Sequence, residues 1–211
     1  MTVIVRHPTL VAFDFDGTMT RGESFMRFLA FVTPGWRLPW LTLRSLPYLL
    51  AYLLRLMPSE RAKERVTTLF LRGRARSALL PLALRFGRER IPQTLRPEAV
   101  ARLNHHLKQG HLCVLVSATL ALYLEPWAHE MGFDSVLATG LEVDAQGRFT
   151  GRLGTPNCYG QAKADRIRAH YGEVRLLAAY GDTRGDREML AMAEQPGYRL
   201  WHRRRGQARC P

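Results

Sequence analysis

The most constraining feature of this chain is an apolar segment near its N-terminus that runs directly into two carboxylates. Residues 10–18 read Leu-Val-Ala-Phe-Asp-Phe-Asp-Gly-Thr. A continuous apolar run of this length is typical of a strand buried on both faces of a parallel sheet. Asp14 and Asp16 lie two residues apart, so in an extended chain their side chains point the same way. Because ligands of open α/β sheets bind outside the carboxyl ends of the strands, this segment predicts a site at that edge.

A second acidic cluster follows another apolar run, far along the chain. Residues 176–180 are apolar or aromatic, and Asp182 and Asp186 follow shortly after them. Carboxylates brought together repel one another unless a cation lies between them or one takes up a proton. A single Asp after a strand is often no more than a helix N-cap or a turn residue. Four such residues after two strands favour a shared cation site.

Two polar residues elsewhere could complete this site. Ser117 follows an apolar run over 112–116, and we expect a helix N-terminus there, which can bind an anion or can simply use Ser117 as its N-cap. Lys163 lies near the start of a predicted helix, where the helix dipole does not favour a cation, although surface lysines often occupy such positions. Carboxylates, a hydroxyl and an ammonium together can hold Mg²⁺ and clamp a phosphate.

The order of the predicted elements indicates one domain with a parallel sheet. At 211 residues the chain is long enough to bury one core. Strands that alternate with helices are typical of an α/β fold with a doubly wound parallel sheet, and we predict that fold class here. The expected elements are strands over 10–15, 112–116 and 176–180, helices over 98–108, over 120–131, from about 161 and after 186, and a hairpin around 144–147.

The stretch between the first strand and residue 96 has a helical pattern instead of a short crossover. We expect helices over 23–32 and 77–90, and another that begins with Ser59 as its N-cap. This stretch therefore reads as a helical insertion after the first strand. The predicted organisation is a discontinuous core of residues 1–20 and 97–202, a helical cap insertion of residues 21–96 and a basic tail of residues 203–211.

The chain is strongly basic, and the excess charge is unevenly distributed. It contains 31 Lys and Arg against 18 Asp and Glu, a net charge of +13. Residues 21–98 alone hold fifteen Lys or Arg and five Glu. Such asymmetry suggests a polyanion or an anionic membrane surface as a neighbour, and an ordinary solvated basic surface explains it equally well.

The apolar stretch over residues 36–57 leaves two interpretations open. A helix that is apolar on nearly all sides is either buried or in contact with lipid. Trp36, Trp40 and the arginines around them would suit an interfacial segment beside anionic headgroups. The competing interpretation is the core of a helical bundle or a dimer interface. A bilayer span is excluded, because Arg44 and Arg55 leave only ten uncharged residues between them, and spanning needs roughly 20.

Three cysteines bear on the compartment. Cys113, Cys158 and Cys210 are an odd, scattered set without the spacing of a metal site, which favours a reducing compartment. The first residues also lack the charged-then-apolar pattern of a signal peptide. We expect a cytoplasmic protein, with peripheral contact at the inner membrane surface as an open alternative.

Taken in order, the DxDGT segment, the strand-end serine, the lysine and the GDxxxD segment resemble the haloacid dehalogenase-like (HAD) phosphatases. The resemblance covers essentially residues 9–200, and it is to the branch with a helical cap after the first strand. It implies that Asp14 is the nucleophile that forms an aspartyl-phosphate. It also implies that Asp16 first protonates the leaving group and then activates water. A dehalogenase of this fold needs no acid at that position, so Asp16 favours phosphoryl transfer.

The same resemblance implies the remaining roles. Mg²⁺ would be bound by Asp14, the Asp16 backbone carbonyl and Asp182, with Asp186 as a supporting residue. The phosphoryl group would be bound by Ser117 and Lys163, together with Thr18 and Ala118 in the same motifs.

The substrate is less narrowly indicated. Glu23 stands nine residues after Asp14, where phosphoserine phosphatases carry a glutamate that contacts the substrate. The sequence departs from that group at Ser117-Ala118-Thr119, where Ser-Gly-Gly is expected, and at Lys163, which follows Gly160 by three residues instead of preceding a glycine. This Gly-x-x-Lys spacing and a cap rich in Leu, Pro, Trp and Arg resemble the C-type phosphatidylglycerophosphatases.

The sequence therefore predicts a Mg²⁺-dependent phosphomonoester hydrolase that acts through an aspartyl-phosphate. Its substrate is either a lipid phosphate or a small metabolite phosphate such as phosphoserine or histidinol phosphate. The alternative from another class is a non-catalytic basic protein that binds nucleic acid or anionic membrane on the same scaffold. A binding module has no need for four carboxylates at the strand ends, so we do not expect a nucleic acid partner. Nothing in the sequence predicts the oligomeric state.

Overall fold

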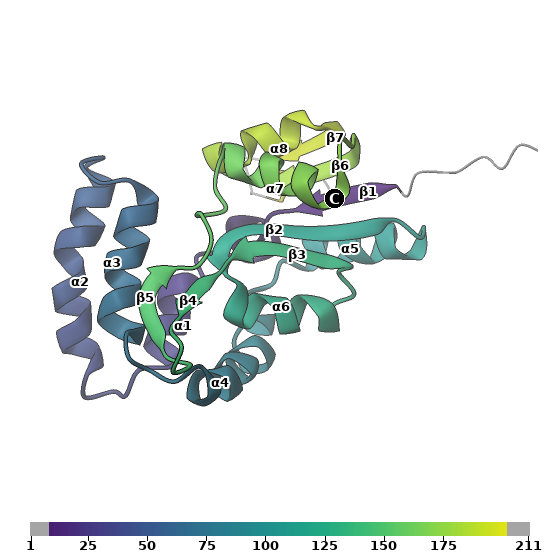
Figure 1. Ribbon diagram of the computed structural model, residues 1–211. Helices are drawn as coiled ribbons and strands as arrows, with labels where there is room; N and C mark the ends of the chain where they lie inside the picture. Colours follow the sequence, from purple (N-terminus) through teal and green to yellow (C-terminus); the bar gives the residue numbers. More distant parts are fainter. Residues whose placement is uncertain (1–8, 202–211) are drawn as a thin grey trace, which may run out of the picture.

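The computed structural model describes residues 9–201, which form a parallel sheet covered by helices on both faces (Figure 1). The sheet has five strands in the order β3-β2-β1-β6-β7, and all neighbours run parallel. Strand β1 lies at the centre, so the predicted doubly wound α/β fold is confirmed. The strands are β1 (Leu10–Phe13), β2 (Leu112–Leu120), β3 (Ser135–Thr139), β6 (Leu176–Gly181) and β7 (Ala193–Tyr198).

Strand β1 is apolar throughout because both of its faces are buried. Val11 and Phe13 belong to the larger hydrophobic core, on the side of α5 (Pro97–Lys108) and α6 (Ala121–Glu130). Leu10 and Ala12 pack on the opposite side, against α7 (Gln161–Tyr171) and α8 (Arg187–Ala191). The carboxyl end of this fully buried strand is therefore fixed in position from both sides.

Four helices lie between β1 and α5, as the sequence pattern predicts. Helices α2 and α3 stand apart from the sheet, and α1 and α4 lie nearer to it (Figure 1). Phe28 of α1 and Phe86 of α4 are buried and stack on Tyr123 of α6, with ring centroids 4.6 and 5.1 Å from the tyrosine ring. One hydrophobic core thus runs from the sheet into these helices. Their bounds are α1 (Phe25–Phe31), α2 (Leu38–Leu53), α3 (Ser59–Leu71) and α4 (Arg76–Glu89).

A small antiparallel hairpin packs against α3. It consists of β4 (Leu141–Val143) and β5 (Phe149–Leu153) and contains the turn expected around 144–147. The Thr68 hydroxyl of α3 donates to the Gly151 carbonyl at 3.2 Å, and the Gly73 amide donates to the Phe149 carbonyl at 2.8 Å. The hairpin therefore joins the helical insertion in space, although it is distant in sequence.

Several local expectations are corrected. Strand β2 continues to Leu120, which is the N-cap of α6, so Ser117 is not a helix cap. Ser59 is the first residue of α3 and Pro58 occupies the N-cap position. Strands β3 and β7 were not expected, because β3 is short and half-buried and β7 carries polar residues, a proline and a glycine at the sheet edge.

Three further expectations concern the basic tail, the cysteines and the possibility of a membrane-spanning helix. The basic tail 203–211 and Cys210 lie outside the described residues, and the other two cysteines are buried free thiols. Within residues 9–201, no helix is both long enough and apolar enough to cross a bilayer.

The close packing of β5 on α3 predicts a specific intolerance at Gly151. Its φ is +91°, and a Cβ there would lie 2.6 Å from the Thr68 Cα. Gly147, in the turn of the same hairpin, has a φ of +73° with open space around it. Alanine in this left-handed region costs about 1–2 kcal/mol, and a clash with backbone adds about 1–3 kcal/mol. In urea unfolding, the free energy of unfolding should therefore fall about 1–3 kcal/mol further for Gly151→Ala than for Gly147→Ala. Equal losses would contradict the close contact between β5 and α3.

Candidate active site

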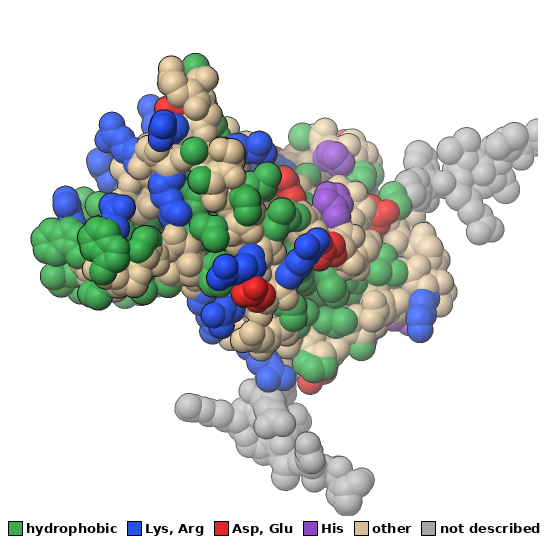
Figure 2. Space-filling model, turned by 90° about the horizontal axis from the view of Figure 1, so that it is seen from below, with side chains coloured by type: hydrophobic (Ala, Val, Ile, Leu, Met, Phe, Trp, Pro, Cys, Tyr) green, Lys and Arg blue, Asp and Glu red, His purple; other side chains and the backbone are tan. Residues whose placement is uncertain are grey.

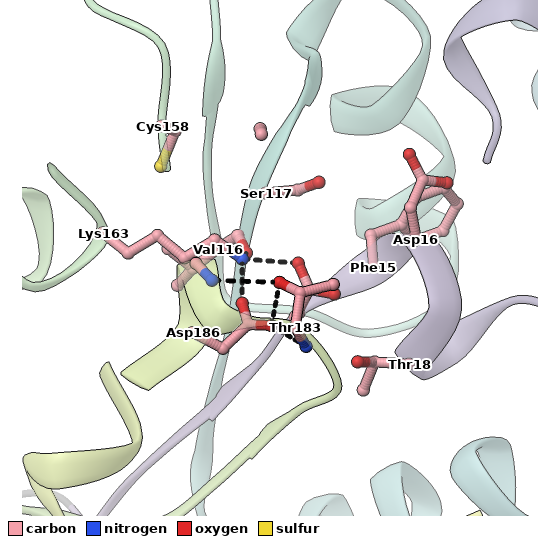
Figure 3. A network of polar contacts seen from close by, with 12 residues as sticks. Phe15, Asp16, Thr18, Val116, Ser117, Cys158, Lys163, Thr183 and Asp186 are labelled. Atoms are coloured by element: carbon pink, nitrogen blue, oxygen red, sulfur yellow. Dashed lines mark hydrogen bonds and ion pairs between the residues drawn. The ribbon is translucent and has the colours of Figure 1, made fainter. Parts of the chain in front are cut away.

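Polar side chains from three neighbouring strands and one helix meet at the carboxyl edge of the sheet. Asp14 follows β1, Ser117 lies in β2, and Asp182 follows β6. Lys163 reaches them from the first turn of α7 (Figure 3). The sheet thus brings together residues up to 168 positions apart, as the strand-end rule predicts.

The centre of the site is the buried ammonium of Lys163. Its Nζ lies 2.5 Å from Oδ1 of Asp14 and 2.6 Å from Oδ1 of Asp186, and it donates to the Val116 carbonyl at 2.9 Å. These three acceptors match the three donors of an ammonium. The side chain is only 2% exposed. Burial by itself lowers the pKa of Lys163, but the two carboxylates outweigh that effect and the net direction is upward, so the group stays charged.

Asp186 holds the loop that follows β6. Its Oδ2 accepts hydrogen bonds from the Asp182 amide at 3.1 Å, and from the amide and hydroxyl of Thr183 at 2.8 Å each. Burial raises the pKa of this carboxyl, and Lys163 and the Thr183 bonds outweigh it, so the net direction is downward. Asp186 is therefore an ionised group that fixes the position of Asp182.

The turn after β1 approaches Asp182 very closely. This turn, η1 (Phe15–Met19), contains Gly17 with a φ of +83°. A Cβ on Gly17 would lie 2.3 Å from Oδ2 of Asp182, so only glycine fits. The Thr18 hydroxyl donates to Oδ1 of Asp182 at 3.3 Å. Thr18, predicted at the phosphate, is thus placed against the second acidic cluster.

The carboxylates suit a divalent cation. Asp14, Asp182 and Asp186 are buried, and one oxygen of each lies within 4.8 Å of the others. Hard oxygen donors of this kind are the ligands that Mg²⁺ prefers. The pKa of Asp14 is raised to about 7, mainly by burial and also by the neighbouring Asp186 and Asp182, against the opposing effect of Lys163. A cation would relieve that repulsion, and Asp14 and Asp182 are the better candidate ligands because Asp186 already accepts four hydrogen bonds.

Asp16 has surroundings quite different from those of Asp14. Its carboxylate accepts hydrogen bonds from the Ser24 amide at 2.9 Å and from the Ser24 hydroxyl at 3.0 Å, well apart from Lys163 (Figure 3). Burial raises the pKa of Asp16 to about 8, with a further contribution from Glu23 and an opposing one from Ser24. Two acids two residues apart therefore have different partners: Asp14 is paired with an ammonium, whereas Asp16 is held by Ser24.

A cavity of about 400 Å³ opens above these groups. The sheet edge contributes Asp14, Asp16, Ser117, Ala118 and Lys163, all predicted site residues, and Glu23 lines it as well. Asp182, Asp186 and Thr18 are not in its wall. The helices of the insertion supply the opposite wall, which is largely apolar: Phe25, Met26, Leu49, Tyr52, Ala62 and Val66.

Sequence reasoning missed Lys63 of α3, which lines the same cavity. Its Nζ donates to the Ala118 carbonyl and, at 2.8 Å, to Oδ1 of Asn157. Burial lowers the pKa of Lys63 to about 8, while Asp16 and Glu23 oppose that effect. Lys63 is the only lysine among the basic residues of 21–96, but its identity alone does not place it at the site. Its contacts across the cavity do.

The shared ammonium predicts a pH-dependent stability defect. Lys163→Met leaves two buried carboxylates without their cation, and breaking a buried ion pair in this way costs about 3–5 kcal/mol. The free energy of unfolding in urea should fall by about that much near pH 8. Without Lys163, the pKa values of Asp14 and Asp186 should be raised by burial in the folded variant, which then binds protons more tightly than the unfolded chain, so the defect should shrink as the pH falls. Lys108→Met, on the exposed end of α5, should change stability by less than about 0.5 kcal/mol at either pH. A Lys163→Met defect independent of pH would contradict this electrostatic account.

Comparisons with known proteins agree with this geometry. The profile of the haloacid dehalogenase-like hydrolases matches residues 11–191. Protein CicA of Caulobacter vibrioides is 39% identical over 198 residues, which cover 92% of this chain and 87% of CicA. A protein of unknown function from Bordetella pertussis Tohama I has a similar structure, with a TM-score of 0.78, 27% identity, and coverage of 90% of this chain and 89% of that one.

The fold is also that of a probable phosphoserine phosphatase from Vibrio cholerae, with a TM-score of 0.67, 16% identity, and coverage of 91% of this chain and 56% of that one. The profile match spans most of the chain and includes both acidic clusters and the lysine between them. The chain belongs to the haloacid dehalogenase-like hydrolase family.

Proposed function

We propose that this protein is a Mg²⁺-dependent phosphomonoester hydrolase that acts through an aspartyl-phosphate on Asp14. The observation that carries the proposal is the placement of Asp14. Its carboxylate lies at the base of a cavity, 2.5 Å from a buried ammonium and within reach of two more carboxylates that suit a divalent cation. A buried carboxylate with charge compensation, facing a cavity, is the arrangement that a covalent nucleophile needs.

The reaction divides into two transfers at phosphorus. An Asp14 oxygen attacks the substrate phosphorus, and the bond from phosphorus to the leaving oxygen breaks while the Asp16 carboxyl gives that oxygen its proton. In the second step Asp16, now ionised, takes a proton from water, whose oxygen attacks the same phosphorus. The Asp14–phosphorus bond breaks, and inorganic phosphate leaves.

The other site residues would bind the transferred group. Lys163 and Ser117 lie beside Asp14 at the sheet edge, where the Ser117 hydroxyl and the Ala118 backbone would contact the phosphoryl oxygens. The Lys163 ammonium would bind them in exchange for one of its present acceptors, and would offset the negative charge. Mg²⁺, held by Asp14, Asp182 and the Asp16 carbonyl with Asp186 in support, would supply a positive charge to the same oxygens.

We propose that residues 21–96 act as a cap that sets substrate choice, because their helices form the wall opposite the nucleophile. Two substrate classes have structural support. The apolar wall suits a lipid phosphate, while Glu23 and Lys63 in that wall could pair with the charged groups of a small metabolite such as phosphoserine. The proposed location is cytoplasmic, with peripheral membrane contact if the substrate is a lipid.

A phosphatase panel with a matched pair of variants tests the proposal. Wild type should hydrolyse p-nitrophenyl phosphate and some soluble or micellar lipid phosphates with Mg²⁺, and should lose that activity in EDTA. Asp14→Asn removes the attacking charge, so turnover should fall by about 10³-fold or more with unchanged circular dichroism. Asp165→Asn, on the exposed side of α7, should retain wild-type rates. Near-normal turnover by Asp14→Asn would reject the nucleophile, and full activity in EDTA would reject the metal.

The separate surroundings of Asp16 predict an effect that depends on the leaving group. A general acid contributes about 10²–10⁴-fold where the leaving oxygen needs a proton. Asp16→Asn should therefore slow the hydrolysis of an alkyl phosphate by about that factor. The rate loss on p-nitrophenyl phosphate should be smaller, because the departing p-nitrophenolate needs little protonation. Single-turnover measurement of nitrophenol release isolates this first step. Equal losses on both substrates would assign Asp16 a role other than proton donor.

A further inference from the structure

Exposed hydrophobic side chains are concentrated on α2 and on the residues directly before and after it. Among the described residues twelve large hydrophobic side chains are exposed, and nine of them lie between residues 36 and 56. Figure 2 shows hydrophobic side chains gathered at the left end of the molecule, where α2 lies, with basic side chains beside them. The nine are Trp36, Trp40, Leu43, Leu46, Leu50, Tyr52, Leu53, Leu54 and Leu56.

This exposure has a regular cause in the helix. Leu41 and Ser45, four residues apart, are buried and form the inner side of α2. Trp40, Leu43, Leu50 and Leu54 follow the spacing of three, seven and four residues that places side chains on one opposite side. The inner side is covered by the rest of the insertion, whereas the outer side remains apolar and open. Contiguous exposed apolar surface of this kind marks an interaction site.

The charges on this face select its occupant. Between Ser24 and Ser59 the chain contains four arginines and no acidic residue. The Arg37 and Arg44 guanidinium groups lie 5.7 and 5.8 Å from the ring centroids of Trp36 and Trp40, so the positive charge lies directly beside the apolar surface. A second copy of this chain, packed face to face through α2, would bring these arginines together without acidic partners. In a bilayer with anionic lipids, the headgroups would form ion pairs with these arginines, and the apolar side chains would be buried in the acyl region beneath them.

We infer that the outer face of α2 binds the surface of an anionic lipid bilayer, with the helix parallel to the membrane. Tryptophan suits the headgroup boundary because its ring is apolar and its N–H is polar. Leu43, Leu50 and Leu54 would enter the acyl region, and the arginines would remain at the headgroups. The inner side of the same helix contributes Leu49 and Tyr52 to the catalytic cavity, so binding would bring that cavity beside the membrane.

Vesicle sedimentation with two matched variants tests this surface. Wild type should sediment with vesicles of phosphatidylcholine and phosphatidylglycerol, less so with phosphatidylcholine alone, and less as salt rises. Trp40→Ser/Leu43→Gln/Leu50→Gln should weaken partition by at least about tenfold, because burying each such side chain is strongly favourable. Leu200→Gln is the control: Leu200 is as exposed as Leu50, at 56%, but lies outside α2. Arg37→Gln/Arg44→Gln should abolish the preference for anionic vesicles.

Two further readouts separate the alternatives. The triple variant should keep wild-type hydrolysis of p-nitrophenyl phosphate and wild-type unfolding, since its side chains point away from the cavity and the core. Lack of any phosphatase activity would reject the proposed function, but it would not affect the conclusion from vesicle sedimentation, because the two measurements are independent. No sedimentation of wild type with anionic vesicles at low salt, or equal sedimentation of the triple variant, would overturn the membrane surface. A dimer in analytical ultracentrifugation that only the triple variant disrupts, without vesicle binding, would assign the face to a second copy.

Discussion

The buried ammonium of Lys163 is the interaction on which the geometry of the site depends. Its three acceptors come from the end of β1, from β2 and from the loop after β6, so one group ties together three neighbouring strands. A buried charge without a partner is costly, and each of these charges is tolerated because the others are present. Asp186 extends the constraint to Asp182 through the Asp182 amide. The positions of the proposed nucleophile and of the candidate metal ligands are therefore set by one network.

The sequence was sufficient to place most of this network. Asp14 and Asp182 could be expected to meet because a buried strand, its carboxyl-end residues and the alternation of strands with helices are local patterns with a known three-dimensional consequence. Lys163 lies in a helix, and it was added to the site because of its unusual position there and the family resemblance. Strand β7 could not be expected, because Ala193–Tyr198 lacks the apolar pattern of a buried strand and forms only at the sheet edge. A helix N-terminus was expected at Ser117 because the apolar run ends before it, yet β2 continues for four more residues.

Contacts between segments that are distant in the sequence could not be predicted from local sequence patterns. Lys63 is one of fifteen basic residues over 21–98, and its role depends on the Ala118 carbonyl and Asn157, which lie 55 and 94 residues away. For the segment 36–57, a buried core helix and an interfacial helix both remained possible, because the sequence predicts a helix that is apolar on nearly all sides. Which side becomes covered depends on α3, which packs against α2, and that information is absent from the periodicity of the segment itself. The structure leaves one whole side of α2 open.

Because the insertion begins directly after the turn that follows β1, its first residues contact Asp16 and influence it, whereas Asp14 is held by the sheet. Ser24, immediately before α1, holds Asp16 through both its amide and its hydroxyl. The same hydroxyl lies 2.8 Å from Tyr123 and 3.1 Å from Thr119, so α1, β2 and α6 all converge behind Asp16. Glu23 raises the pKa of Asp16 from the same segment. Asp14 is thus governed by the sheet and its ammonium, whereas the position and protonation of Asp16 are governed by the first residues of the insertion. A helical insertion that begins directly after this turn can therefore shape the cavity and set the position of Asp16, the proposed proton donor, without altering Asp14, the proposed nucleophile.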